Sequence, residues 1–108
     1  MSKKVAIILI NWNSYDLTRD TLNSLQKVTY MDLDVIVVDN GSTDESGDRL
    51  EAEFPEVIML KSSSNTGFTG GNNIGFQYAL DQGYTYAMML NNDVEVAPDF
   101  LAPLIGKM

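Results

Sequence analysis

Four short polar segments carry the side chains that could do chemistry in this sequence: residues 11–14, 39–44, 65–73 and 91–93. They are rich in asparagine, aspartate and glycine, and each comes after an apolar run. Amides and carboxylates hydrogen-bond to sugars and bases, backbone N–H groups bind anions, and oxygen ligands hold hard cations. The chain has no histidine and no cysteine, which excludes histidine general bases, thiolate metal sites and disulfides.

Asp39 stands directly after the apolar residues 35–38. Such a carboxylate either caps a turn or contacts a ligand. We favour the ligand, because an acid after the second strand of a Rossmann-like sheet commonly holds a nucleoside hydroxyl or base edge. For Asp44 we favour a structural role at a helix N-terminus over a ligand contact. Trp12, the only tryptophan, fits either the core or the rim of the sheet.

The glycine-rich loop that leads to Asn72 and Asn73 lacks the G-x-G-x-x-G spacing and comes after the third apolar run instead of the first. The dinucleotide fingerprint is therefore excluded. We expect this loop to open a helix at Asn72, Asn73 and Ile74, whose N-terminus would accept an anion without a basic side chain. Residues 62–106 contain no lysine or arginine, which agrees with that kind of site.

Asp93 closes the fourth polar segment, and Glu95 stands two residues later. The acid either caps a turn or, with phosphates from a substrate, ligates Mg²⁺ or Mn²⁺. The residues alone leave the two alternatives balanced.

Strands and helices alternate along the chain, which positions these segments. Continuous apolar runs predict buried strands at residues 5–10, 35–38, 57–60 and 84–90. Helical spacing predicts helices at residues 15–28 and 74–82, the second with Ile74, Tyr78 and Leu80 inward and Gly83 as its C-cap. Residues 94–96 and a helix after Pro98 complete the pattern.

A middle helix is predicted from a capping box formed by Ser42 and Glu45, and Pro55 ends it after about residue 54. Right-handed crossovers then predict an α/β fold, a Rossmann-like three-layer parallel sheet of order 3-2-1-4. Ligands bind such sheets at the carboxyl ends of the strands, where all four polar segments meet.

Length and charge narrow the function further. With 108 residues the chain is at most one domain, and its net charge of −8 makes unassisted nucleic-acid binding a poor candidate. No apolar run approaches the roughly 20 residues that span a bilayer, and the N-terminal run lacks a signal-peptide cleavage site.

These strand-end motifs together resemble one known family. N-W-N at 11–13, V-D-N-G-S-T-D at 38–44, N-T-G at 65–67, G-G-N-N at 70–73 and N-N-D at 91–93 resemble the N-terminal half of GT-A inverting glycosyltransferases of family 2. The rhamnosyltransferase-like branch is similar in its N-N-D motif. The resemblance covers essentially the whole chain and implies a nucleotide-diphospho-sugar transferase fold.

The resemblance also implies roles for single residues. Asn11 and Asn13 would contact the nucleoside, Asp39 the pyrimidine base or ribose, and the glycine-rich stretch the diphosphate. Asp93 matches the last acid of the D-x-D motif that binds Mg²⁺ or Mn²⁺, while Asn91 replaces the first acid and weakens ligation from that position. The full set of expected substrate-binding residues is Asn11, Trp12, Asn13, Asp39, Asn65, Gly67, Gly71, Asn72, Asn91 and Asn92.

The implied function is transfer of a sugar from a UDP- or dTDP-sugar to a glycan or lipid-linked acceptor, by direct displacement at the anomeric carbon. The family's general base lies in the second half of the domain, so we expect a truncated, inactive donor-binding fragment with no catalytic residue of its own. A catalytically incomplete nucleotide-binding module is the alternative. The same resemblance places the protein in the cytoplasm, with membrane association of a full-length form, and an uncovered apolar face predicts self-association.

Other α/β classes fit less well. A receiver domain needs paired acids after the first strand, where this chain has Asn11 and Asn13, and a phosphatase needs a second acid at the position of Gly41.

Overall fold

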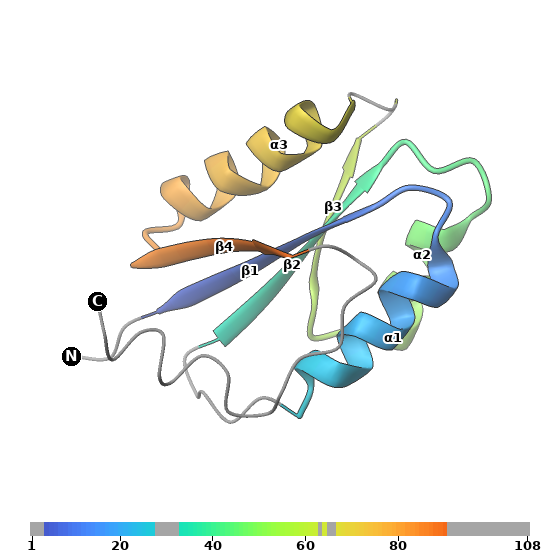
Figure 1. Ribbon diagram of the computed structural model, residues 1–108, viewed down its shortest axis with the longest axis horizontal. Helices are drawn as coiled ribbons and strands as arrows, with labels where there is room; N and C mark the ends of the chain where they lie inside the picture. The colour runs from blue at the N-terminus through green and yellow to red at the C-terminus, as the bar shows by residue number, and fades with distance from the viewer. Residues whose placement is uncertain (1–3, 28–32, 63, 65–66, 91–108) are drawn as a thin grey trace.

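A single parallel sheet organises the chain. The computed structural model describes residues 4–27, 33–62, 64 and 67–90, and the fold is built from these residues (Figure 1). The strands are β1 (Val5–Asn11), β2 (Leu33–Asn40), β3 (Ile58–Ser62) and β4 (Tyr86–Leu90). They lie in the order β3-β2-β1-β4, which confirms the predicted topology.

β1 is the central strand, because it pairs in parallel with both β2 and β4. Its residues from Val5 to Leu9 are fully buried, as expected for an apolar run covered on both faces. The register places Asn11 of β1 opposite Asp39 of β2. The carboxyl ends of two neighbouring strands therefore bring a carboxylate and an amide together at this edge of the sheet.

Helices cover both faces of the sheet. α1 (Tyr15–Leu25) and α2 (Ser46–Glu53) lie on one face, and α3 (Gly67–Asp81) lies on the other (Figure 1). Each face has its own apolar core: Leu22, Leu25, Leu50 and Phe54 pack on the first, and Ala79 packs against Ala6 and Ile8 on the second. The three-layer prediction is confirmed.

The predicted capping box of α2 is wrong. The helix begins at Ser46, and Glu45 precedes it in the left-handed region with φ 65° and makes no side-chain cap. Asp44 Oδ1 instead accepts the Ser46 N–H at 3.0 Å, and hydrogen bonding from Ser46 lowers the pKa of Asp44. The hydroxyl of Ser42 donates to Asp39 in place of capping the helix. The predicted end of the helix before Pro55 is confirmed.

α3 begins at Gly67, seven residues before the predicted start at Ile74. The glycines that suggested a loop serve close packing: a Cβ at Gly75 would lie 2.5 Å from Ile8 Cγ2, and one at Gly71 would lie 3.1 Å from Ile10 Cδ1. Glycine therefore lets the helix approach β1 closely. The predicted inward side chain of Leu80 is wrong, since Leu80 is 75% exposed and Ala79 is buried in its place.

The C-terminus of α3 agrees with the prediction. Gly83 has φ 78°, its N–H bonds to Leu80 O, and the Tyr84 N–H bonds to Ala79 O. These two bonds are the Schellman pattern. Val28, residues 94–96 and the helix expected after Pro98 lie outside the described residues. None of the described helices has the length and apolarity needed to cross a bilayer.

Tyr84 lies at the amino edge of the sheet, opposite the polar segments. Its hydroxyl donates a hydrogen bond to Asp34 Oδ2, near the start of β2, at 2.5 Å. Lys4 lies over the Tyr84 ring at 4.7 Å and 3.9 Å from the Asp34 carboxylate. Burial and the hydrogen bond to Asp34 raise the pKa of Tyr84 above its usual value.

We predict that Gly75→Ala destabilises the protein, because the added methyl group would press on Ile8. Overpacking costs about 1–3 kcal/mol and alanine regains at most about 1 kcal/mol of helix propensity, so a net loss remains. Urea unfolding measures it. Leu80→Ala on the exposed side of α3 is the control and should change stability by no more than about 0.5 kcal/mol. Equal stability of wild type and Gly75→Ala would contradict the close packing.

A second prediction concerns alkaline pH. Since the folded-state pKa of Tyr84 is raised, its contribution to stability is complete below the unfolded value of about 10 and declines as the pH rises above it. Urea midpoints at about pH 8 and about pH 10.5 should fall more steeply in wild type than in Tyr84→Phe. The residual slope comes from other groups whose pKa is raised, among them Tyr15 and Lys61. Parallel slopes in the two proteins would contradict the prediction.

Candidate functional site at the carboxyl edge of the sheet

Three of the four polar segments have described residues at the carboxyl edge. The ends of β1 and β2 lie side by side there through the pairing of Asn11 with Asp39. The first turn of α3 joins them, because Asn40 Nδ2 donates to Gly67 O at 3.0 Å. Asn65, Asn91, Asn92 and Asp93 lie outside the described residues, so their predicted roles stay predictions.

Asp39 is the central acid of this edge. Its side chain is largely buried, and Oδ1 accepts hydrogen bonds from Ser42 Oγ at 2.5 Å and Asn11 Nδ2 at 3.2 Å. Among the described residues Oδ2 makes no hydrogen bond, which leaves it as an acceptor for a ligand. Oδ2 lies against the first turn of α2, where a Cβ at Gly47 would approach it to 1.9 Å.

Asn11 has a different place from the predicted nucleoside contact. It is fully buried, and its amide is engaged on both sides. Oδ1 accepts the Thr18 hydroxyl at 2.8 Å, while Nδ2 faces Ser46 Oγ at 2.8 Å in addition to Asp39 and Ser42. In this structure Asn11 is bonded to other site residues and does not reach the surface.

Asn13 ties the loop after β1 to the loop after β2. Its Oδ1 accepts the Thr43 N–H at 2.8 Å, and its backbone N–H donates to Ser42 Oγ at 3.0 Å. The residue has φ 48°, a left-handed conformation that asparagine tolerates better than most residues. Trp12 beside it is 48% exposed, which places it on the rim and not in the core.

Asn72 of α3 is only 9% exposed, and its Oδ1 has no hydrogen-bond partner among the described residues. Ile74 and Tyr78 of the same helix border a cavity with Leu60 of β3. Asn72 is turned about 200° from Ile74 around the helix axis, so it lies on a different side of α3 from this cavity. The anion site predicted at an N-terminus formed by residues 72–74 is corrected, because that N-terminus is at Gly67.

Ser42, Ser46, Thr18 and Gly47 were missed as site-building residues. Ser42 belongs to a recognised motif, and only its mistaken role as a helix cap hid its contact with Asp39. For Ser46 and Thr18 the sequence carries a weaker signal, a hydroxyl at a position that packing on the sheet would bury. The role of Gly47 can be recognised only from the structure, which shows the Asp39 carboxylate in the space that a side chain at Gly47 would fill.

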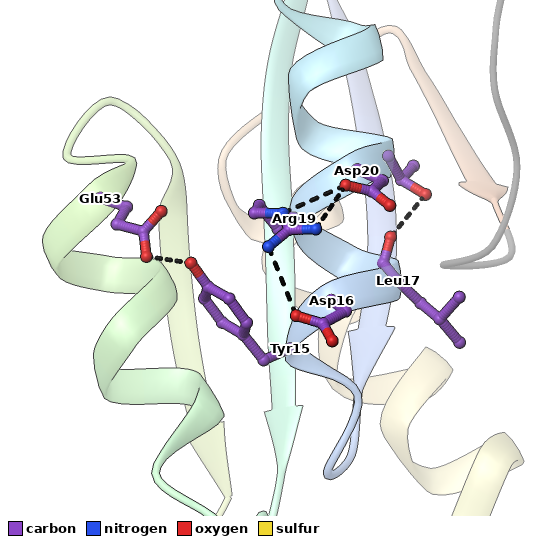
Figure 2. A network of polar contacts seen from close by, with 7 residues as sticks. Tyr15, Asp16, Leu17, Arg19, Asp20 and Glu53 are labelled. Atoms are coloured by element: carbon purple, nitrogen blue, oxygen red, sulfur yellow. Dashed lines mark hydrogen bonds and ion pairs between the residues drawn. The ribbon is translucent and has the colours of Figure 1, made fainter.

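A second polar cluster fixes α1 against α2 near this edge. Figure 2 shows the Tyr15 hydroxyl of α1 pointing to the Glu53 carboxylate of α2, to which it donates a hydrogen bond. The Arg49 guanidinium lies 3.7 Å from the centre of the Tyr15 ring, and Arg19 pairs with Asp16 and Asp20 on α1 itself. The hydrogen bond to Glu53 raises the pKa of Tyr15.

The described residues do not form a metal site of their own. Nowhere in them do three acidic, histidine or cysteine side chains come together as a ligand set. Asp93, the predicted ligand, is not among them. The fit of a metal ion therefore depends on Asp93 and on oxygens that a ligand would bring.

Comparison with known proteins decides the family. The model of the family described as "Glycosyl transferase family 2" matches residues 6–108. The chain belongs to glycosyl transferase family 2. An uncharacterized glycosyltransferase of Nostoc sp. is 33% identical over 79 residues, which cover 70% of this chain and 24% of that protein.

Solved structures share the fold of this family 2 chain. S. aureus TarS 1–349 in complex with UDP aligns with a TM-score of 0.83 at 20% identity, over 95% of this chain and 31% of that 1–349 chain. The mannosyltransferase PcManGT of Pyrobaculum calidifontis, in complex with GDP-Man and Mn²⁺, aligns with a TM-score of 0.82 at 21% identity. The alignment covers 97% of this chain and 32% of the PcManGT chain. The chain thus spans about a quarter to a third of the length of these three matched chains. These likenesses confirm the predicted GT-A fold.

We predict that Ser42→Ala in this family 2 chain lowers the free energy of unfolding by about 1–3 kcal/mol, because Asp39, Asn11 and the Asn13 N–H each lose a partly buried partner. Urea unfolding measures the loss. Thr43→Ser keeps a hydroxyl beside Asn13 on an exposed residue and is the control, with an expected change within about 0.5 kcal/mol. Similar stability of the two variants would contradict the central role of Ser42.

Proposed function

We propose that this chain binds the nucleotide-sugar donor of an inverting glycosyltransferase, with a UDP- or dTDP-sugar as the donor and a glycan or lipid-linked molecule as the acceptor. One observation carries the proposal: Asp39 is fixed through Oδ1 at the switch point of the sheet, and Oδ2 accepts no hydrogen bond from the described part of the chain. A pyrimidine imide N–H or a ribose hydroxyl supplies the matching donor.

The charge distribution supports a diphosphate held without basic side chains. Residues 62–106 contain no lysine or arginine, and α3 begins within this stretch. The 15-residue helix presents its N-terminal N–H groups at the edge where Asp39 lies. Backbone groups, with Asn72 nearby, are the proposed phosphate and sugar contacts.

The metal belongs to the same proposal. Asp93 would ligate Mg²⁺ or Mn²⁺, and the bound ion would neutralise charge on the leaving nucleoside diphosphate. The Mn²⁺ in the mannosyltransferase complex of the same fold supports the choice of metal.

Isothermal titration of the 108-residue chain with UDP, dTDP and GDP in Mn²⁺ tests the donor. We expect the pyrimidine nucleotides to bind, and Asp39→Ala to weaken their affinity about tenfold to one hundredfold, the value of a hydrogen bond to a charged group. Asp34→Ala at the opposite edge is the matched control and should leave the affinity unchanged. Absence of any nucleotide binding in wild type would contradict the proposed function.

Omission of the metal gives a separate prediction. UDP affinity should rise when Mn²⁺ is added to the wild-type chain, and Asp93→Ala should remove that rise while it leaves the metal-free affinity in place. Glu56→Ala, an exposed acid bonded to Gln26 on the far side of the molecule, controls for the loss of one negative charge. An equal response of Asp93→Ala and wild type to Mn²⁺ would exclude Asp93 as a ligand.

A further inference from the structure

Asn11 is an unusual residue to find at the end of the central strand. It is a polar side chain with no exposed surface, and a buried amide is costly unless its donors and acceptor are paired. All of them are paired here, with side chains from three different parts of the fold: Thr18 of α1, Asp39 and Ser42 at the end of β2, and Ser46 at the start of α2. Such a residue orders the groups around it.

The chemistry of these partners fixes which way the amide faces. An ionised carboxylate only accepts hydrogen bonds, so the amide atom 3.2 Å from Asp39 Oδ1 must be the NH₂ group. The amide oxygen then faces Thr18, whose hydroxyl donates to it at 2.8 Å. Nδ2 lies 2.8 Å from Ser46 Oγ and 3.2 Å from Ser42 Oγ. Its two hydrogens are therefore shared among three acceptor oxygens, those of Ser46, Ser42 and Asp39.

We propose that Asn11 is a positioning residue for donor binding, which holds Asp39 by Oδ1 so that Oδ2 stays available to the base or ribose of the nucleotide. This inference rests on the proposed function. It differs from the contact that the sequence resemblance implied, because Asn11 acts on the ligand only through Asp39.

Ser42 cannot supply this positioning alone. The Ser42 hydroxyl donates to Asp39 Oδ1. The position of this hydroxyl depends in turn on the hydrogen bonds that it accepts from the Asn11 side chain and the Asn13 backbone N–H. On the other side of the carboxylate, Gly47 leaves just enough room for Oδ2. Without the amide of Asn11 the carboxylate keeps one hydroxyl donor, and that donor has lost part of its support.

An isosteric substitution tests the proposal. Asn11→Asp keeps the shape of the side chain and the acceptor for Thr18 but replaces the NH₂ donor with an oxygen. UDP affinity in Mn²⁺ should fall at least about tenfold at about pH 8, where two carboxylates would face each other. Asn11→Ala, which removes the donor without adding charge, is the second variant and should lose affinity to a similar degree.

The pH profile separates positioning from general damage to the fold. Two carboxyl groups at this distance share a proton as the pH falls, because the pKa of one of them is raised by the other. That proton restores a donor toward Asp39. The ratio of variant to wild-type affinity should therefore recover at about pH 5.5 for Asn11→Asp and should not recover for Asn11→Ala. A purely structural defect would give the two variants the same profile.

A double-mutant cycle completes the experiment. In an Asp39→Ala background, Asn11→Asp should weaken UDP binding no further, since its effect passes through Asp39. Tyr84→Phe, which loses a hydrogen bond at the opposite edge, should lower stability and leave UDP affinity unchanged. Wild-type affinity in both Asn11 variants, or additive losses in the cycle, would overturn the role of Asn11 alone. No binding of UDP to wild type would instead overturn the proposed function.

Discussion

The pairing of one buried carboxylate with one buried amide, at the ends of two neighbouring parallel strands, is the constraint on which this edge of the protein depends. The register of β1 and β2 sets Asn11 opposite Asp39, and burial removes both side chains from most of the water that would otherwise satisfy them. Their remaining partners must come from neighbouring segments of the chain. The loop after β2 therefore turns to supply Ser42, and α2 starts where Ser46 can reach the amide.

The strands could be predicted from the sequence because burial on both faces leaves an unambiguous apolar run, and short crossovers leave one favoured order. The start of α1 at Tyr15 could also be predicted, but the starts of α2 and α3 could not be. Ser42 fits a helix cap by spacing alone, but its hydroxyl is drawn to a tertiary partner, Asp39, and Asp44 caps α2 instead. Glycines in α3 are locally typical of a loop, whereas Gly71 and Gly75 meet β1 side chains. Close packing of distant segments outweighed local propensity in both cases.

Prediction of the site divides in the same way. The place of Asp39 at the carboxyl edge could be predicted from its position after the second strand, since topology alone brings that position there. The direction of each side chain could not be assigned, so Asn11 was expected to face a nucleoside although it lies fully buried. Gly47 could not be found at all, because its contribution is the space it leaves beside Asp39. The sequence motif therefore predicts which residues lie close together, whereas the packing of the fold determines which of their side chains are exposed to solvent.

The ion pairs of the basic side chains have a consequence for how a ligand arrives. Lys4, Arg19 and Lys61 are each matched to nearby carboxylates, Lys61 with both Asp48 and Glu51. Arg49 borders a pocket with Asn13 and Asp44, so an approaching nucleotide meets some local positive charge, but the net charge of −8 outweighs it. Long-range electrostatics would slow the encounter, so that moderate salt, which weakens the attraction in most phosphate-binding proteins, would here speed association by screening a repulsion.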